Sequence, residues 1–325
     1  MEFEEPAPVP VLAHRRVAHF QSIFDQVKEE PLRRIYIFCD GPRDLKEKAA
    51  QMSILEHSKS AGPQLQVFRN FQKGNLGLRN AVMAGIDWFM SEEEAGIILE
   101  DDTLPSPDFL NFCDQGLDLY RHCATIMQIS GYNALGRTPW QFFPRKVHSL
   151  SPRMNSWGWA TWRDRWQNFR AAKDIRATDP KRTHAPPGLY RELEKGHKGE
   201  LAGTVDSWDY SWAYYSLAQR GLSVVPASNT IQNIGFGPEA THTHNGVSAR
   251  VHPMAARTVY PARIRASIGF AYAEHFQEHL RLRSSRLKKR IKGSWAWVSR
   301  VILRRFSSCF LAVASGWLAR ARRNR

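Results

Sequence analysis

The sequence lacks any long hydrophobic run, and no segment approaches the ~20 apolar residues that cross a bilayer. Residues 1–10 are acidic and proline-rich rather than basic and then apolar, so we expect no signal peptide. The four cysteines fit neither the spacing of a zinc site nor a paired disulfide framework. This usage is typical of reduced thiols, and we expect a cytoplasmic protein.

Acidic residues are missing from the end of the chain. No Asp or Glu follows Glu278, whereas residues 281–325 contain fourteen Lys and Arg. Almost all of the net charge of +15 therefore belongs to this final segment. The rest of the chain is close to neutral, so the basic excess says little about the remaining 280 residues.

Apolar runs alternate with helical patterns through the first half of the chain. The pattern predicts strands at Val9–Ala13, Ile35–Asp40, Gln64–Arg69, Gly96–Glu100, Thr125–Gly131 and Leu222–Ala227. Helices are predicted over 17–27, over 78–89, and from Pro107 to Tyr120 with Ser106 as the cap. This alternation predicts an α/β fold with a mostly parallel central sheet and helices on both faces.

The pattern weakens between residues 133 and 220, where Trp, Pro and Gly become frequent. We expect this stretch to cover one end of the sheet and to build a pocket. Within it, the charged residues 173–200 are interpreted as a surface excursion.

An acidic run, Glu100-Asp101-Asp102, follows the predicted strand at 96–100. The carboxyl ends of parallel strands are where open α/β folds bind ligands. Carboxylate oxygens there suit Mg²⁺ or Mn²⁺, which would offset the charge of a bound diphosphate. An acidic turn without a ligand is the alternative interpretation.

Several motifs carry a resemblance to a known family. Leu99-Glu100-Asp101-Asp102 with Pro107-Asp108-Phe109-Leu110 resembles the metal-binding segment of the N-acetylglucosaminyltransferase I family. The stretches Ser156–Trp162 and Trp208–Trp212 resemble segments of bacterial relatives that include cell-surface-polysaccharide glycosyltransferases. The resemblance covers roughly residues 8–244. It implies a GT-A fold, which is a Rossmann-like nucleotide-sugar domain, and a metal-dependent inverting transfer of a sugar.

The resemblance also implies roles for residues that would bind the nucleotide sugar. Asp102 would be the metal ligand, while Glu100 and Asp101 would contact the ribose and the transferred sugar. Asp40 would read the uracil edge, which favours a UDP-sugar, and Arg16 would bind the phosphates. The alternatives are a turn-forming Asp40 and a solvated Arg16.

Asp209, in Trp208-Asp209-Tyr210-Ser211-Trp212, matches the catalytic base of the family. An inverting displacement needs one base to take the proton of the acceptor hydroxyl. The family has a second acid where this chain has Tyr210. Asp206 is the alternative base, because it would share a helical face with Asp209. Either aspartate could instead cap the helix that begins nearby.

Aromatic and glycine-rich segments add weaker candidates. Trp208 is the best of four tryptophans for stacking on a sugar; the others are Trp157, Trp159 and Trp162, and packing is the alternative for all four. Residues 233–237 and 240–244 resemble the family's loop over the diphosphate. Thr241 would contact the nucleotide sugar there, and His242 or His244 would complete the metal shell, unless both histidines are solvated. Arg79, at a predicted helix start, is a further contact to the nucleotide sugar.

The basic segment 281–325 is predicted to be a separate helical tail. Apolar residues recur at helical spacing between 287 and 306 with Lys and Arg among them, which is typical of a helix on an anionic membrane surface. A nucleic-acid-binding tail and a disordered extension are the alternatives, and we expect no nucleic-acid partner.

The sequence thus predicts a transferase domain over 1–280, with a donor half at 8–132 and an acceptor half at 133–250. The expected partners are a nucleotide sugar, a glycan or lipid-linked acceptor, and the inner face of the membrane. Two other functions remain open: a nucleotidyltransferase or sugar-phosphate enzyme, and an inactive carbohydrate-binding protein. The first would need a glycine-rich loop after the first strand, but 11–17 contains no glycine.

Overall fold

The computed structural model describes residues 5–30, 32–134, 148–172, 175 and 185–235. Within these residues the chain forms one eight-stranded sheet, a two-stranded sheet and seven helices. The strands are β1 (Val9–Ala13), β2 (Ile35–Cys39), β3 (Val67–Phe71), β4 (Ala95–Glu100), β5 (Thr103–Pro105), β6 (Ile126–Ser130), β7 (His148–Ser151), β8 (Trp159–Trp162), β9 (Leu222–Pro226) and β10 (Ile231–Asn233). The helices are α1 (Val17–Lys28), α2 (Leu45–Ser58), α3 (Leu78–Glu92), α4 (Pro107–Tyr120), α5 (Arg163–Ala171), α6 (Pro187–Leu201) and α7 (Asp209–Ala218).

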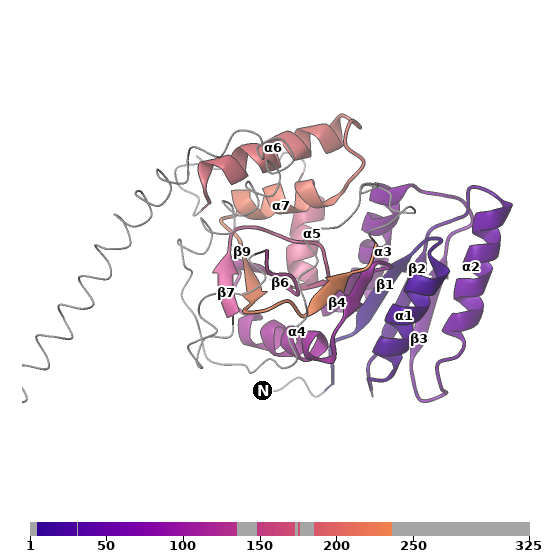
Figure 1. Ribbon diagram of the computed structural model, residues 1–325. Coiled ribbons are helices and arrows are strands. Elements are labelled where there is room, and N and C mark those ends of the chain that lie inside the picture. The colour runs from indigo at the N-terminus through magenta and orange to yellow at the C-terminus, as the bar shows by residue number, and fades with distance from the viewer. Residues whose placement is uncertain (1–4, 31, 135–147, 173–174, 176–184, 236–325) are drawn as a thin grey trace, which may run out of the picture. The chain divides into compact units, whose positions relative to one another are not determined.

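The large sheet has the order β3-β2-β1-β4-β8-β6-β9-β7 (Figure 1). Strands β3, β2, β1 and β4 are parallel, as are β6 and β9, while β8 and β7 run antiparallel to their neighbours. The chain builds outward from β1 to β3 and then returns to place β4 on the other side of β1. The carboxyl ends of β1 and β4 therefore flank the point where the strand order reverses, which is where open α/β sheets bind ligands.

Strand alternation explains how both faces of the sheet are covered. Val9 and Val11 of β1 pack with α1, α2 and α4, whereas Leu12 points to the opposite face and packs with α3. The second face also holds α5 and α7, whose tryptophans fill the core there. Since both of their faces are buried, β1, β2 and β4 are almost continuously apolar, and this is why they were visible in the sequence.

The predicted α/β class with a mostly parallel sheet is confirmed, as are the six predicted strands to within a few residues at their ends. The predicted cap of α4 is also confirmed, since the Ser106 side chain accepts a hydrogen bond from the backbone N–H of Phe109. Strands β5, β7, β8 and β10 and helices α2, α5 and α6 were not predicted.

One prediction about the second half is wrong. Residues 173–200 were expected to form a charged surface excursion, but 187–201 form helix α6. Its residues Leu189, Leu193, His197 and Glu200 are buried, and Glu200 bonds to the first turn of α7. A face of residues spaced three or four apart explains why the segment is helical.

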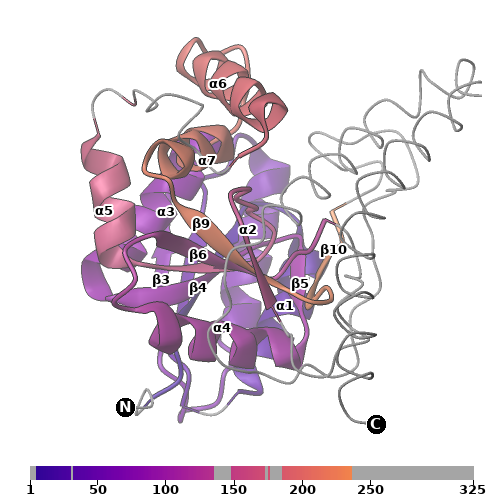
Figure 2. The ribbon, with the colours of Figure 1, turned by 90° about the vertical axis from the view of Figure 1, so that its left-hand side faces the viewer.

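The short strands β5 and β10 pair antiparallel to form a separate two-stranded sheet beside α1 (Figure 2). Because β5 directly follows the acidic run, this pairing brings residues 231–235 next to Asp102. None of the helices in the described part of the chain is long and apolar enough to span a membrane. The predicted basic tail, residues 281–325, lies outside that part.

Candidate functional site

The acidic run forms a tight turn at the carboxyl end of β4. Glu100 is the last residue of the strand, and Asp101 and Asp102 form the turn into β5. Thr103 closes this turn, because its hydroxyl accepts a hydrogen bond from the Glu100 N–H and donates one to the Glu100 carbonyl, both at 2.9 Å. The three carboxylates are thereby held on a short, fixed piece of backbone.

Arg16 is the cation that faces this turn. It precedes α1 at the carboxyl end of the neighbouring strand β1, and its Nη1 lies 3.2 Å from Asp101 Oδ1 and 2.9 Å from Asp102 Oδ2. Burial raises the pKa of Asp101 to about 6, against the lowering effect of the Arg16 guanidinium. Burial alone would lower the pKa of Arg16, but the two carboxylates raise it above its ordinary value. Arg16 was predicted to bind the phosphates of a nucleotide sugar, and the structure places its side chain against the acidic run.

Asp209 and Trp208 reach the same turn from the other half of the chain. Hydrogen bonding from the Trp208 side chain lowers the pKa of Glu100, whereas the charge of Asp209 raises it. Burial, followed by the charges of Asp102 and Asp209, raises the pKa of Glu100 well above its usual range. The site therefore gathers four carboxylates, of which Asp101 and Asp102 contact the Arg16 guanidinium and Asp209 acts on Glu100.

Asp209 is the first residue of α7, and its carboxylate is held by two hydroxyl groups. Ser207 donates a hydrogen bond to Oδ1, and Ser156 donates one to Oδ2 at 3.4 Å. Neither serine was singled out in the sequence. Asp206 was expected to share a helical face with Asp209, but this is wrong because it is exposed and precedes the helix.

Gly235 lies directly against the carboxylate of Asp102. A Cβ atom added to Gly235 would stand 2.3 Å from Asp102 Oδ2 and 2.7 Å from its Cβ, so no side chain fits there. The backbone N–H of Ile234 donates to the Asp102 carbonyl at 2.8 Å. The first residues of the predicted diphosphate loop thus fix Asp102 in place, while Thr241, His242 and His244 lie outside the described residues.

The tryptophans mostly belong to the core. Trp159, Trp162 and Trp208 are at most 3 % exposed, and Trp208 stacks on Trp159 with ring centroids 5.6 Å apart. The prediction that Trp208 offers a face to a sugar is therefore not met in this structure, where its ring is buried against Trp159. Trp157 is half-buried and lies edge-on to Tyr132.

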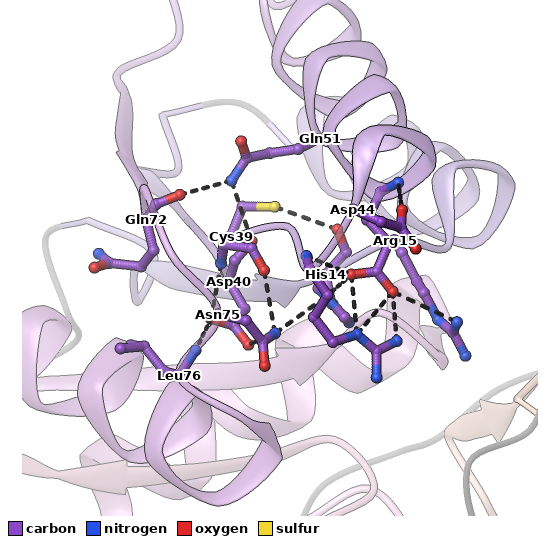
Figure 3. Close-up of polar contacts among 12 residues, drawn as sticks. His14, Arg15, Cys39, Asp40, Asp44, Gln51, Gln72, Asn75 and Leu76 are labelled. Atoms are coloured by element: carbon purple, nitrogen blue, oxygen red, sulfur yellow. Dashed lines mark hydrogen bonds and ion pairs between the residues drawn. The ribbon is translucent and has the colours of Figure 1, made fainter.

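Asp40 lies at the carboxyl end of β2, and Figure 3 shows its hydrogen bonds. Its carboxylate accepts from the backbone N–H groups of Gly41 and Leu76, at 2.7 and 2.8 Å, and from the Asn75 side chain at 2.8 Å. The residue is 4 % exposed. Asp40 thus ties the turn before α3 to β2, which agrees with the turn-forming alternative, and any contact to a nucleobase would compete with these bonds.

A polar cluster surrounds this turn on the side of β1. His14 Nε2 lies 3.3 Å from Glu47 Oε2, and the carboxylate of Glu47 also contacts Arg15 and Arg43. The hydrogen bonds from Arg43 lower the pKa of Glu47 to about 2. The backbone N–H of His14 also donates a hydrogen bond to Asp101 Oδ2 at 3.4 Å, so this cluster connects the Asp40 turn to the acidic run.

Arg79 lies in the first turn of α3 and is half-buried. Its Nε is buried without a hydrogen-bond partner among the described residues, and its charge acts on His197 of α6. No group of three His, Cys, Asp or Glu side chains with the arrangement of a complete metal site occurs among the described residues.

Comparisons with known proteins reveal only distant similarities. No protein-family profile matches the chain, and no curated protein matches it either. Among solved structures, a mannosyltransferase from Pyrobaculum calidifontis, in complex with GDP-Man and Mn²⁺, is 12% identical over 60% of this chain with a TM-score of 0.37. The match covers 53% of that protein, or about half its length.

Two structures of UDP-glucose pyrophosphorylase are also similar. The complex with UDP-glucose is 10% identical over 70% of this chain and 92% of that one, with a TM-score of 0.33. The apo form is 10% identical over 85% and 99% of the two chains, with a TM-score of 0.34. At these values the similarities extend no further than the α/β fold class, which the strand topology shows directly.

Proposed function

We propose that this protein is a metal-dependent inverting glycosyltransferase that uses a nucleotide-diphosphate sugar, with UDP favoured. The acceptor is a glycan or a lipid-linked saccharide in surface-polysaccharide synthesis. One observation carries the proposal: Asp101 and Asp102 face Arg16 at the edge of the sheet where the strand order reverses, and the charge of Asp209, far away in sequence, acts on the adjacent Glu100. Carboxylates gathered at that point suit a phosphate-bearing ligand only if a cation joins them.

The residues present fit a divalent cation that arrives with its substrate. The Asp102 side chain is 22% exposed and offers hard oxygen atoms at the turn. Mg²⁺ and Mn²⁺ in phosphate-handling sites commonly take one or two carboxylates and complete their shell with phosphate oxygens and water. A complete protein cage is thus unnecessary, and Asp102 would hold the ion, with His242 or His244 as further ligands. Bound there, the ion would offset the charge that develops on the departing diphosphate.

The side chains around Asp102 suit the other parts of the reaction. Arg16 faces the turn with a guanidinium that can reach phosphate oxygens once Asp101 and Asp102 bind other groups. Glu100 and Asp101 would contact the ribose and the sugar. The Asn75 side chain contacts both His14 and Asp40, at the end of the site where the base would lie.

Asp209 would act as the base of the transfer step. The acceptor hydroxyl loses its proton to the Asp209 carboxylate while its oxygen bonds to the anomeric carbon, and the bond from that carbon to the diphosphate oxygen breaks. Ser207 and Ser156 hold the carboxylate in one orientation. Such fixed placement contributes to the rate because the reacting atoms must be aligned before transfer.

The decisive experiment is a panel of nucleotide sugars scored for hydrolysis and transfer with Mn²⁺ and with EDTA. We expect turnover that depends on the metal and that is highest with a UDP-sugar. Asp102→Asn should abolish metal-dependent binding of the nucleotide sugar. Asp209→Asn should retain binding and stop transfer, and loss of both would make Asp209 structural. Asp164→Asn, at an aspartate 61% exposed on α5, is the matched control and should behave as wild type.

The same panel separates this function from nucleotidyl transfer. A nucleotidyltransferase would turn over a nucleoside triphosphate with a sugar phosphate and release pyrophosphate. The segment between β1 and α1 is His14-Arg15-Arg16, without the glycine-rich loop that such an enzyme would use to wrap the triphosphate. Pyrophosphate release with any pair of these substrates, and no transfer from a nucleotide sugar, would replace the proposed function.

We further propose that residues 281–325 bind the anionic inner surface of the membrane and bring the enzyme to a lipid-linked acceptor. This segment contains fourteen basic residues, and its apolar residues recur at helical spacing between 287 and 306. The full-length protein should float with liposomes that contain anionic lipid at low salt and dissociate as salt is raised. A chain that ends at residue 280 should stay unbound, and binding that persists in it would place the membrane contact elsewhere.

A further inference from the structure

Helix α7 begins without a cap of its own. The residue at its N-cap position is Trp208, and no side-chain hydrogen bond from that residue satisfies the first turn. Helix starts usually carry Ser, Thr, Asp or Asn at this position, because the first N–H groups have no partner within the helix. Trp208 instead packs its ring on Trp159, and its side chain lowers the pKa of Glu100. Position 208 therefore holds a core residue that acts on the acidic run and does not cap the helix.

Glu200 supplies the missing cap from the neighbouring helix. Its Oε1 accepts the backbone N–H of Tyr210 at 3.0 Å, and its Oε2 accepts that of Ser211 at 2.8 Å. The Ser211 hydroxyl donates to the same Oε2. These are the second and third residues of α7, whose N–H groups an ordinary cap would satisfy.

The two helices fit closely at this junction. A Cβ atom added to Gly196 of α6 would stand 2.1 Å from Cδ1 of Tyr210, so the aromatic ring lies on the backbone of α6. His197 Nδ1 lies 3.0 Å from the Ser211 hydroxyl and adds a second link. The end of α6 is thereby fixed against the first turn of α7.

This arrangement places a second buried carboxylate beside Asp209. Glu200 is 3 % exposed, and burial raises its pKa, with the charge of Asp209 acting in the same direction. A buried charge is costly unless hydrogen bonds and a favourable dipole offset it. A neutral cap at position 208 would avoid this cost, but it would remove the tryptophan that reaches Glu100.

We propose that Glu200 is a positioning residue for the transfer step, which sets where Trp208 and Asp209 stand relative to Glu100–Asp102. This inference rests on the proposed role of Asp209. Glu200 contacts neither Asp101 nor Asp102 among its described hydrogen bonds, so its loss should leave the binding of the nucleotide sugar intact. The expected effect is on the rate of transfer.

The test uses the full-length protein with Glu200→Gln. Glutamine has a single acceptor oxygen, and its NH₂ group would face a backbone N–H, so one of the two backbone bonds is lost. We expect kcat for transfer to fall roughly tenfold or more, because small displacements of a base are costly. The KM and Kd for the nucleotide sugar with Mn²⁺ should stay within about twofold of wild type. Glu194→Gln on the same helix, at a half-buried residue paired with Lys198, is the matched control and should change neither.

A second measurement is independent of activity. Amide hydrogen exchange at Tyr210 and Ser211 should accelerate in Glu200→Gln and stay slow in Glu194→Gln, since only the first removes a cap. Ser211→Ala removes one donor to Glu200 and should lower kcat by a smaller factor. If exchange accelerates and kcat stays at the wild-type value, Glu200 is a structural cap and the proposal is overturned.

These outcomes also distinguish a failure of the proposed transferase function from a failure of the positioning role of Glu200. If no nucleotide sugar reacts with the wild-type protein, the proposed function fails, and a positioning role in that transfer fails with it even if exchange shows the cap. If wild type is active and Glu200→Gln loses nucleotide-sugar affinity in parallel with kcat, only the positioning role fails. An unchanged exchange rate at Tyr210 and Ser211 would mean that Glu200 does not hold the start of α7.

Discussion

The Trp208 side chain, acting as a hydrogen-bond donor, lowers the pKa of Glu100. This interaction joins the residue before α7 to the last residue of β4, and it crosses between the two halves of the chain. Glu100 is also surrounded by Asp101, Asp102 and Asp209, so this donor is among the few groups that favour its charged form. The tryptophan therefore has an electrostatic role as well as a packing one.

Trp208→Phe removes the indole N–H while keeping an aromatic ring in the core. Losing this donor at the half-buried Glu100 should destabilise the fold by about 1–3 kcal/mol, and Asp209 should move from its place. Denaturant unfolding and transfer kinetics measure both effects. The matched control is Trp166→Phe, because Trp166 packs on Trp208 and donates to Asp87, whose side chain is 38% exposed and can turn to water. Equal losses of transfer in both variants would contradict the role of the Trp208 bond.

Gly235→Ala tests whether the start of the diphosphate loop holds Asp102. The added methyl carbon would stand 2.3 Å from Asp102 Oδ2, so either the carboxylate or the loop must shift. We expect Mn²⁺-dependent binding of the nucleotide sugar to weaken roughly tenfold or more, since a metal ligand tolerates little displacement. Titration calorimetry with and without Mn²⁺ measures this. Gly62→Ala, where an added methyl group meets nothing within 4 Å, should bind as wild type.

Arg16→Gln should make the protein depend on a divalent cation for stability. Without the guanidinium, Asp101 and Asp102 repel each other, and the metal-free protein should lose about 1–3 kcal/mol of unfolding free energy. A cation that binds only the folded chain would restore stability by mass action. Adding Mn²⁺ should therefore raise Tm more in Arg16→Gln than in wild type. In Arg170→Gln, which breaks an exposed pair with Asp87, the Mn²⁺ response should match wild type, and an equal response in both variants would place the ion elsewhere.

The sequence predicted the half of the fold that is buried on both faces. Strands such as Val9–Ala13 appear as unbroken apolar runs, and the Ser106-Pro107 pair marks the start of α4. Strand β7 has the sequence His-Ser-Leu-Ser, and β10 has only three residues, so neither carries such a run. Their pairing depends on partners elsewhere in the chain, which no local pattern reveals.

Helix α6 was not predicted from the sequence, although its buried residues have helical spacing. Three glycines and several charged residues made the segment resemble a loop, yet Leu189, Leu193 and His197 recur every four residues, which is a helical signal. In the site, the acidic run, Arg16 and Asp209 could be named from motifs. Their mutual distances could not, because they follow from the strand order, which places β4 beside β1. The roles of Ser156, Ser207 and Glu200 likewise needed the structure.

The burial of His148 should make the free energy of unfolding depend on pH. His148 begins β7, is 5% exposed, and lies 2.8 Å through Nε2 from the hydroxyl of Tyr120, and burial lowers its pKa to about 4. An unfolded histidine titrates near about 6.5, so between these values the unfolded chain binds a proton that the folded chain does not. Stability should therefore fall as pH is lowered through this window, by about 2 kcal/mol at pH 5 from this residue alone. Urea unfolding at pH 7 and at pH 5 measures the loss, which should shrink by that amount in His148→Gln. His122→Gln, at an exposed histidine, is the control and should leave the pH dependence of stability as it is in wild type. An unchanged pH dependence in His148→Gln would mean that His148 is not the group that the folded state keeps neutral.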